Sequence, residues 1–237
     1  MEHEERKRRG RGNEQIGTSV VPSMKRIEFN HIVPAAFSHE DNTSSEIWCK
    51  DMVFEKGCKY LIEASSGRGK STFCSYIVGY RHDYEGDILF DGNDVKCLTI
   101  ADWTTIRREH IGYLFQELRL FPELTTLENI SIKNSLTNSL TADEINGWID
   151  RLALSDKKNT KTGLMSFGQQ QRVAFIRALA QPFDFLILDE PISHLDESNA
   201  QVMSDIVQEV ISRNGAGLII TSIGKHMDID YDKVIRL

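Results

Sequence analysis

Three short segments in a fixed order constrain this chain more than any other feature of its 237 residues. A loop rich in Gly and Ser, Ala64–Thr72, comes first. The stretch Met-Ser-Phe-Gly-Gln, residues 165–169, follows, and an apolar run that ends in Asp189 and Glu190 comes third. Backbone N–H groups of a glycine-rich loop and the start of the next helix form a site for phosphate. An apolar strand that ends in acids places carboxylates at the edge of a parallel sheet where ligands bind. The order therefore predicts an α/β nucleotide-binding fold.

The first segment matches the phosphate-loop pattern G-x-x-x-x-G-K-[ST] with Ala64 in place of the first glycine. Lys70 is expected to bridge the β- and γ-phosphates, and the Ser71 hydroxyl to ligate Mg²⁺. Alanine is small, so we interpret Ala64 as a tuning change, although a plain Gly/Ser turn before a helix is the alternative. The residues predicted to hold the nucleotide are Ala64, Ser65, Ser66, Gly67, Arg68, Gly69, Lys70, Ser71 and Thr72.

Composition limits the class of protein. With 40% hydrophobic residues, the chain fits one domain of generous size. A net charge of −7 argues against a general nucleic-acid binder. The four cysteines lack metal-ligand spacing, which indicates reduced thiols. No apolar run approaches the ~20 residues that a membrane span needs, and no apolar core marks a secretory signal. We therefore expect a soluble protein that acts at a membrane only through a partner.

Periodicity predicts one domain over residues 25–237, after a charged and disordered tail at 1–24. Capping boxes at Thr99 and Thr141 indicate two helix starts. The chain is expected to stop at residues 234–237, just after its final strand, without room for a C-terminal regulatory domain. The predicted strands and helices alternate, which indicates a largely parallel central sheet. The strands are 27–32, 47–55, 58–62, 86–91, 111–115, 184–188 and 218–221, and the other helices are 70–78, 169–180 and 202–213.

The three segments, together with Gln116 at the end of Tyr-Leu-Phe-Gln, resemble those of ATP-binding cassette (ABC) ATPases. The resemblance extends from about Ile27 to the C-terminus. It implies a P-loop NTPase fold with an N-terminal antiparallel β-patch and a helical subdomain at roughly 117–172. It also implies that Gln116 touches Mg²⁺ and water, that Asp189 holds Mg²⁺ indirectly, and that Glu190 is the base that positions the attacking water.

The middle segment resembles the L-S-G-G-Q signature of the family, with Phe167 in place of the first glycine. In the family this segment contacts the γ-phosphate held by the opposite subunit. The resemblance thus implies nucleotide contacts by Ser166, Gly168 and Gln169, and a dimer with shared sites. Residues 193–196 resemble the D-loop, which links the two sites, and Asp196 is its predicted contact residue.

Two family positions are less regular. The aromatic residue that stacks on adenine is expected at Phe37, near the end of the first strand. Ser222 stands where the family has its switch histidine after the last core strand, so we assign Ser222 to this catalytic position. The serine side chain is too short to replace an imidazole that reaches the γ-phosphate, which argues against rapid hydrolysis. His226 could reach the site only by local rearrangement.

The resemblance implies an ATPase subunit that binds ATP and Mg²⁺, dimerises, and drives separate permease subunits at the cytoplasmic face of the cell membrane. Residues 106–129 look most like the lipoprotein-releasing, macrolide-exporting and cell-division branch. Ser222 motivates an alternative function, in which the protein is a low-turnover clamp that binds ATP and regulates a membrane partner. A soluble ABC protein that works on DNA or ribosomes is a further alternative, although no coiled-coil insertion, second cassette or basic stripe supports it.

Overall fold

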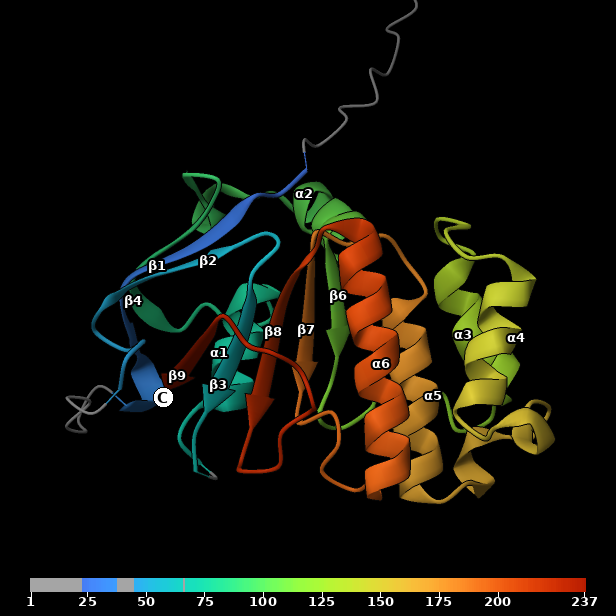
Figure 1. The fold of residues 1–237 in the computed structure, drawn as a ribbon. Helices are drawn as coiled ribbons and strands as arrows, with labels where there is room; N and C mark the ends of the chain where they lie inside the picture. The colour runs from blue at the N-terminus through green and yellow to red at the C-terminus, as the bar shows by residue number, and fades with distance from the viewer. Residues whose placement is uncertain (1–22, 38–44, 66) are drawn as a thin grey trace, which may run out of the picture.

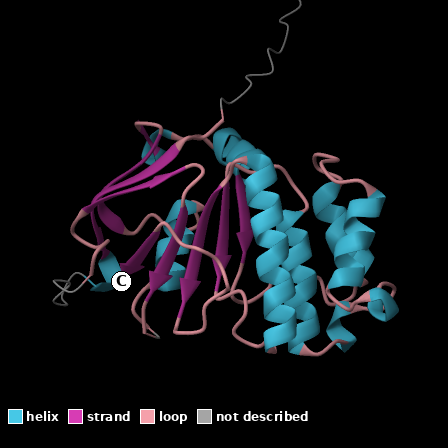
Figure 2. Cartoon of the chain, in the orientation of Figure 1, coloured by secondary structure: helices cyan, strands magenta, loops and turns pink. Residues whose placement is uncertain are grey.

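The computed structural model describes residues 23–37, 45–65 and 67–237, without the side chain of Phe37. The predicted tail at 1–24 therefore lies almost wholly outside the described residues, as does Ser66. Two sheets and a set of helices build the molecule (Figures 1 and 2). The predicted α/β class, with an antiparallel sheet beside a parallel one, is confirmed.

The central sheet is parallel throughout, with the order β6-β7-β8-β3-β9. Its strands are β3 (Lys59–Glu63), β6 (Ile111–Leu114), β7 (Phe185–Asp189), β8 (Gly217–Ser222) and β9 (Lys233–Arg236). The strand β9 was not among the predicted strands, which ended with 218–221; Lys233–Arg236 pairs with β3 at the edge of the sheet. As an edge strand, β9 buries only Ile235, so it lacks the apolar run that marks a central strand.

The antiparallel sheet has the order β2-β1-β4-β5 and packs over one face of the parallel sheet. Its strands are β1 (Arg26–Pro34), β2 (Asp51–Glu55), β4 (Tyr84–Phe90) and β5 (Asn93–Asp94), and a 3-10 turn, η1 (Ala35–Phe37), follows β1. The strand predicted from Ile47 begins only at Asp51. The Ser45 hydroxyl accepts hydrogen bonds from the N–H groups of Ile47 and Trp48 and holds a turn there.

The helices divide between the two faces of the parallel sheet. α1 (Lys70–Ile77) packs between the two sheets, and α5 (Phe167–Leu179) and α6 (Glu197–Asn214) cover the other face. Figure 1 shows α3 (Thr126–Asn134) and α4 (Ala142–Arg151) at the end of the molecule opposite the antiparallel sheet. The remaining helical elements are α2 (Ile100–Thr105), η2 (Val95–Cys97), η3 (Ile106–His110), η4 (Ser155–Lys157) and η5 (Thr162–Leu164). Both predicted capping boxes form, at Thr99 and Thr141.

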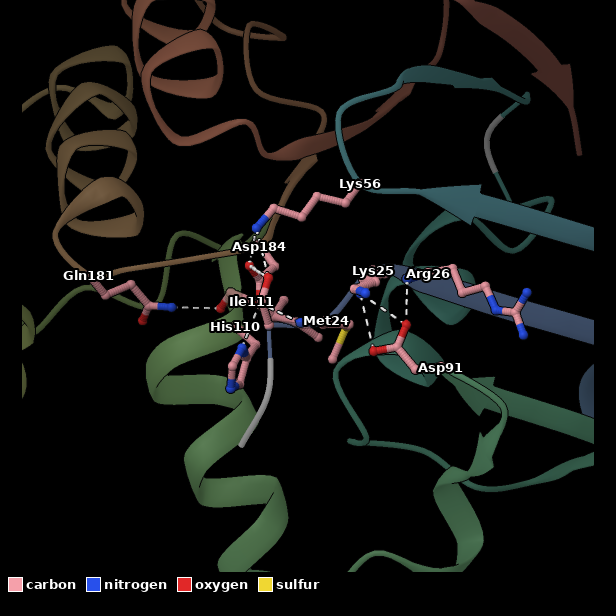
Figure 3. Close-up of polar contacts among 10 residues, drawn as sticks. Met24, Lys25, Arg26, Lys56, Asp91, His110, Ile111, Gln181 and Asp184 are labelled. Atoms are coloured by element: carbon pink, nitrogen blue, oxygen red, sulfur yellow. Dashed lines mark hydrogen bonds and ion pairs between the residues drawn. The ribbon is translucent and has the colours of Figure 1, made fainter. Parts of the chain in front are cut away.

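Asp184 joins four segments at the amino edge of the parallel sheet (Figure 3). The buried carboxylate accepts hydrogen bonds from Ser23 Oγ at 2.8 Å, Met24 N at 2.7 Å, Lys56 Nζ at 2.5 Å and His110 Nδ1 at 2.6 Å. Burial, the largest single influence, raises the pKa of Asp184. The four hydrogen bonds outweigh burial and leave the pKa well below its usual range. We call this group the Asp184 cluster.

Candidate functional site

A pocket of about 210 Å³ lies at the carboxyl edge of the parallel sheet, where the loops after β3, β6 and β7 meet. This is the edge at which ligands bind in open parallel sheets. The pocket is lined by Gly67, Gly69, Lys70, Ser71, Thr72, Gln116 and Glu190. Residues that are far apart in the sequence thus line one pocket: five from the first segment, Gln116 from the loop after β6, and Glu190 from the third segment.

The loop before α1 positions Lys70 at this pocket. Gly69 caps α1 with a φ of +96°, a conformation that glycine adopts without strain. Lys70 is 5% exposed, and its Nζ donates to the carbonyls of Ala64 at 2.9 Å and Ser65 at 3.2 Å. It also lies 3.4 Å from Oε1 of Glu190. A nearly buried ammonium at a helix start is suited to an anionic ligand.

Oxygen ligands gather beside Lys70. The Ser71 hydroxyl donates to Oε1 of Gln116 at 3.0 Å. Asp189 is 2% exposed, and its Oδ1 accepts a 2.5 Å hydrogen bond from the hydroxyl of Thr221. Burial raises the pKa of Asp189, and the hydrogen bond from Thr221 opposes this rise. Sequence reasoning missed Thr221, although the parallel pairing of β7 with β8 places it directly opposite Asp189.

Glu190 leaves β7 in a left-handed backbone conformation, with a φ of +51°. Non-glycine residues seldom adopt this conformation unless their surroundings hold them there. The N–H of Glu190 donates to the carbonyl of Thr221 at 3.2 Å, and its own carbonyl accepts from Nε2 of Gln171 at 3.2 Å. Gln171 is buried in α5 and was also missed. Its signal in the sequence was a polar residue inside an otherwise apolar helix face.

The Ser166–Gln169 segment begins α5, and its two end residues form a capping box with each other. The N–H of Gln169 donates to Ser166 Oγ at 3.3 Å, and the N–H of Ser166 donates to Gln169 Oε1 at 3.0 Å. Gly168 packs so tightly that an added Cβ would lie 3.1 Å from the carbonyl oxygen of His194. In the described chain, neither Ser166 nor Gly168 lines the pocket around Lys70.

The loop from Ser193 to Asp196 lies against this helix start. The rings of Phe167 and His194 are 4.5 Å apart in an edge-to-face arrangement. Asp196 begins α6 and accepts a 2.8 Å hydrogen bond from the N–H of Asn199, which lowers the pKa of its carboxyl group. Ser166 and Asp196 thus both serve as helix caps within the chain.

The polar groups at the end of β8 are held away from the pocket. Ser222 is 3% exposed; its hydroxyl donates to the carbonyl of Lys225 at 2.7 Å and accepts from the N–H of Gly224 at 3.0 Å. Nε2 of His226 lies 2.9 Å from Oε1 of Glu63. A move of His226 toward the pocket would break this pair. The adenine contact of Phe37 stays a prediction, because that side chain is outside the described residues.

The loop after Gln116 is held by the other end of α5. Arg177 donates to the carbonyl of Arg119 at 2.7 Å and to that of Leu118 at 2.6 Å. Both Leu118 and Arg119 have positive φ angles, so the loop makes a tight turn at this point. Burial lowers the pKa of Arg177 to about 10. Helix α5 therefore contacts the Glu190 backbone through Gln171 and the Gln116 loop through Arg177.

Sequence comparison identifies related proteins. The family model described as "ABC transporter" matches residues 51–193. The lipoprotein-releasing system ATP-binding protein LolD of Roseobacter denitrificans is 30% identical over 215 residues, which cover 89% of this chain and 94% of that protein. The macrolide export ATP-binding/permease protein MacB of Escherichia coli is 30% identical over 201 residues, which cover 84% of this chain but only 31% of MacB.

Solved structures share the fold. The dimeric bacterial ABC transporter cassette MJ0796 matches with a TM-score of 0.75 and 24% identity, over 89% of this chain and 94% of that one. A post-hydrolysis dimer of the same cassette, bound to ADP and Pi, matches with a TM-score of 0.68 and 24% identity, over 84% and 88% of the two chains.

Proposed function

The chain belongs to the ABC transporter family of ATP-binding subunits. From this we propose that it is the ATP-hydrolysing subunit of a transporter, and that two copies of the chain enclose ATP and Mg²⁺ between them. The observation that carries the proposal is the convergence of Lys70, Ser71, Gln116 and Glu190 on one pocket. Lys70 would contact the β- and γ-phosphates, and Glu190 would position the attacking water and accept its proton.

The residues beside the pocket fit Mg²⁺. This ion prefers oxygen ligands and is held by one or two protein groups together with substrate phosphates. Ser71, Gln116 and Asp189 offer such oxygens, with Ser71 already bonded to Gln116. When bound, the ion would neutralise charge on the phosphates. Across the described residues, no group of three or more His, Cys, Asp and Glu could hold a metal by itself, which fits a site completed by phosphate.

A second copy of the chain would complete each site. The Ser166–Gly168 segment is outside the pocket of its own chain, yet it presents backbone N–H groups at the positive end of a helix. Its contact with phosphate would then come from the opposite subunit. The dimeric state of the structurally similar cassettes supports this arrangement.

The partners would be permease subunits at the cytoplasmic face of a membrane. Within the residues that the structure describes, no helix has both the length and the apolar character to span a bilayer. MacB is named as an ATP-binding/permease protein, and LolD, which this chain matches over 94% of its length, as the ATP-binding protein of a lipoprotein-releasing system. These names support a permease partner and a place in the lipoprotein-releasing and macrolide-exporting branch. The hydrogen bonds of Ser222 support the second candidate, a clamp with low turnover.

The Glu190→Gln variant tests the proposal. The amide keeps the shape but cannot accept the proton, so ATP should bind, persist and hold two chains together. Light scattering after size exclusion should give a dimer with Mg²⁺-ATP and a monomer without it. Lys70→Ala is the matched control and should lose ATP binding in calorimetry. A monomer at high protein concentration with saturating ATP would contradict the shared sites. The ATPase rate measured with the permease present would distinguish an ATP-hydrolysing transporter subunit, which turns over rapidly, from a clamp with low turnover.

A further inference from the structure

None of the described residues that line the pocket around Lys70 is a histidine, although the family resemblance places one at position 222. Ser222 is 3% exposed, and its hydroxyl is committed to the turn that Gly224 and Lys225 form. The nearest later histidine in the sequence, His226, is paired with Glu63. Neither side chain can therefore hydrogen-bond to a γ-phosphate without loss of contacts that the fold already makes.

An imidazole does lie beside the signature segment. His194 is exposed, and its ring packs edge-to-face on Phe167 with centroids 4.5 Å apart. Phe167 stands where the signature pattern has a glycine, and a glycine would offer no ring for this contact. The two departures, a missing imidazole at position 222 and an aromatic ring at position 167, are therefore connected through His194.

The ring of His194 has one nitrogen held and one open. Ser193 Oγ lies 2.8 Å from Nδ1 of His194 and 3.2 Å from the carbonyl oxygen of Glu190. We assign the hydroxyl proton to the shorter contact, so Ser193 donates to Nδ1 and the proton of the neutral ring is on Nε2. Among the residues that the structure describes, Nε2 has no hydrogen-bond partner. The backbone of His194 packs closely against α5, because a Cβ added to Gly168 would lie only 3.1 Å from the carbonyl oxygen of His194. The imidazole of His194, with its Nε2 open, thus lies beside the ring of Phe167 in the first turn of α5.

We propose that His194 of one copy contacts the γ-phosphate of ATP held by Lys70 and Ser71 of the other copy, and supplies the imidazole that Ser222 lacks. The inference rests on the proposed function, since it needs the dimer with shared sites. In hydrolysis the water oxygen bonds to the γ-phosphorus, the bond to the ADP oxygen breaks, and the water proton passes to Glu190. His194 transfers no proton; its Nε2–H hydrogen-bonds to a γ-phosphate oxygen and stabilises developing charge.

The first test compares the kcat of two variants in which a histidine is replaced by alanine. His194→Ala should lower kcat roughly 100-fold, the usual effect of losing one such donor, with little change in ATP affinity. His194→Gln, which keeps a donor, should recover part of the rate. His226→Ala is the matched control and should leave kcat unchanged. The inference would be overturned by a normal rate in His194→Ala, or by a collapse in His226→Ala alone.

The second test uses mixed dimers purified with two tags, with the Lys70→Ala/unchanged dimer as reference. In a Lys70→Ala/His194→Ala dimer, the one working site receives His194 from the opposite chain and should turn over at the reference rate. When both changes are on one chain and the other is unchanged, the working site lacks that histidine and should be slow. The reverse result, or equal loss in both, would overturn the contact between copies.

The dimer test of Glu190→Gln separates the two proposals. If Glu190→Gln/His194→Ala still forms an ATP-dependent dimer while His194→Ala hydrolyses normally, only the role of His194 fails. If Glu190→Gln forms no dimer with ATP, the shared sites fail and the contact of His194 fails with them.

Discussion

At the scale of single residues, Thr221 is the contact that sequence reasoning could not supply. It donates to Asp189 at 2.5 Å and accepts from the N–H of Glu190 at 3.2 Å. A motif search finds Asp189 and Glu190 because they end an apolar strand. It does not find Thr221, which acts through the register of a neighbouring strand. The hydroxyl favours the ionised form of Asp189 against the opposing influence of burial.

Thr221→Val should therefore weaken the binding of ATP in the presence of Mg²⁺ by roughly tenfold, since a hydrogen bond to a charged group contributes about 1.5–3 kcal/mol. Affinity for ATP without Mg²⁺ should change little, because Thr221 does not line the pocket. Calorimetric titrations with and without EDTA measure both values. Thr221→Ser keeps the hydroxyl and is the control. Equal weakening in both titrations would show that Thr221 acts on the fold instead.

At the scale of elements, the sequence predicted where most strands and helices lie but not how they are joined. Strong periodicity and capping boxes located α4 and the buried strands β7 and β8. The short edge strand β9 carries no such pattern, because one of its faces is exposed. The Asp184 cluster also escaped prediction from the sequence, since the partners of Asp184 come from three distant segments (Figure 3).

Asp184→Asn should lower the free energy of unfolding by about 2 kcal/mol near neutral pH, because the charged hydrogen bonds to Lys56 and His110 are lost. Asp91→Asn is the control. Asp91 also binds backbone N–H groups, of Lys25 and Arg26, but at an exposed turn. Its cost should stay within about 0.5 kcal/mol. Urea denaturation of both variants measures the difference, and equal costs would contradict a special role for the cluster.

The cluster also sets a pH dependence. The folded-state pKa of Asp184 lies below its unfolded value of about 3.9. Its contribution to stability is therefore complete above that unfolded value and is lost as pH falls toward the folded pKa. The native chain should lose stability below about pH 4 more steeply than Asp184→Asn. Parallel slopes in denaturation series over this range would contradict the assignment.

At the scale of the whole molecule, one sheet separates two hydrophobic cores. Neighbouring residues of β3 point to opposite faces: Leu61 packs with α5 and α6, and Ile62 packs with α1 and the antiparallel sheet. Fully buried rings fill both sides, Phe175 on the first and Phe73 on the second. Because the strands are shared, neither core is complete without the other.

Phe73→Ala and Phe175→Ala should each cost about 3–5 kcal/mol, the usual loss for a buried phenylalanine. Both variants should still unfold in a single transition, since each core depends on the shared sheet. Circular dichroism and tryptophan fluorescence should give coincident urea curves. Two separated transitions in either variant would mean that the faces of the sheet unfold independently.

Helix α5 has a length that the rest of the molecule depends on. It begins at Phe167, meets the Glu190 carbonyl at Gln171, and holds two loop carbonyls at Arg177. Inserting a single residue between these positions would turn every later side chain by about 100°, because a helix has 3.6 residues per turn. Arg177 would then face away from the loop that follows Gln116. Over evolutionary time, insertions and deletions between Phe167 and Arg177 should therefore be eliminated, even where single substitutions at exposed positions of α5 are tolerated.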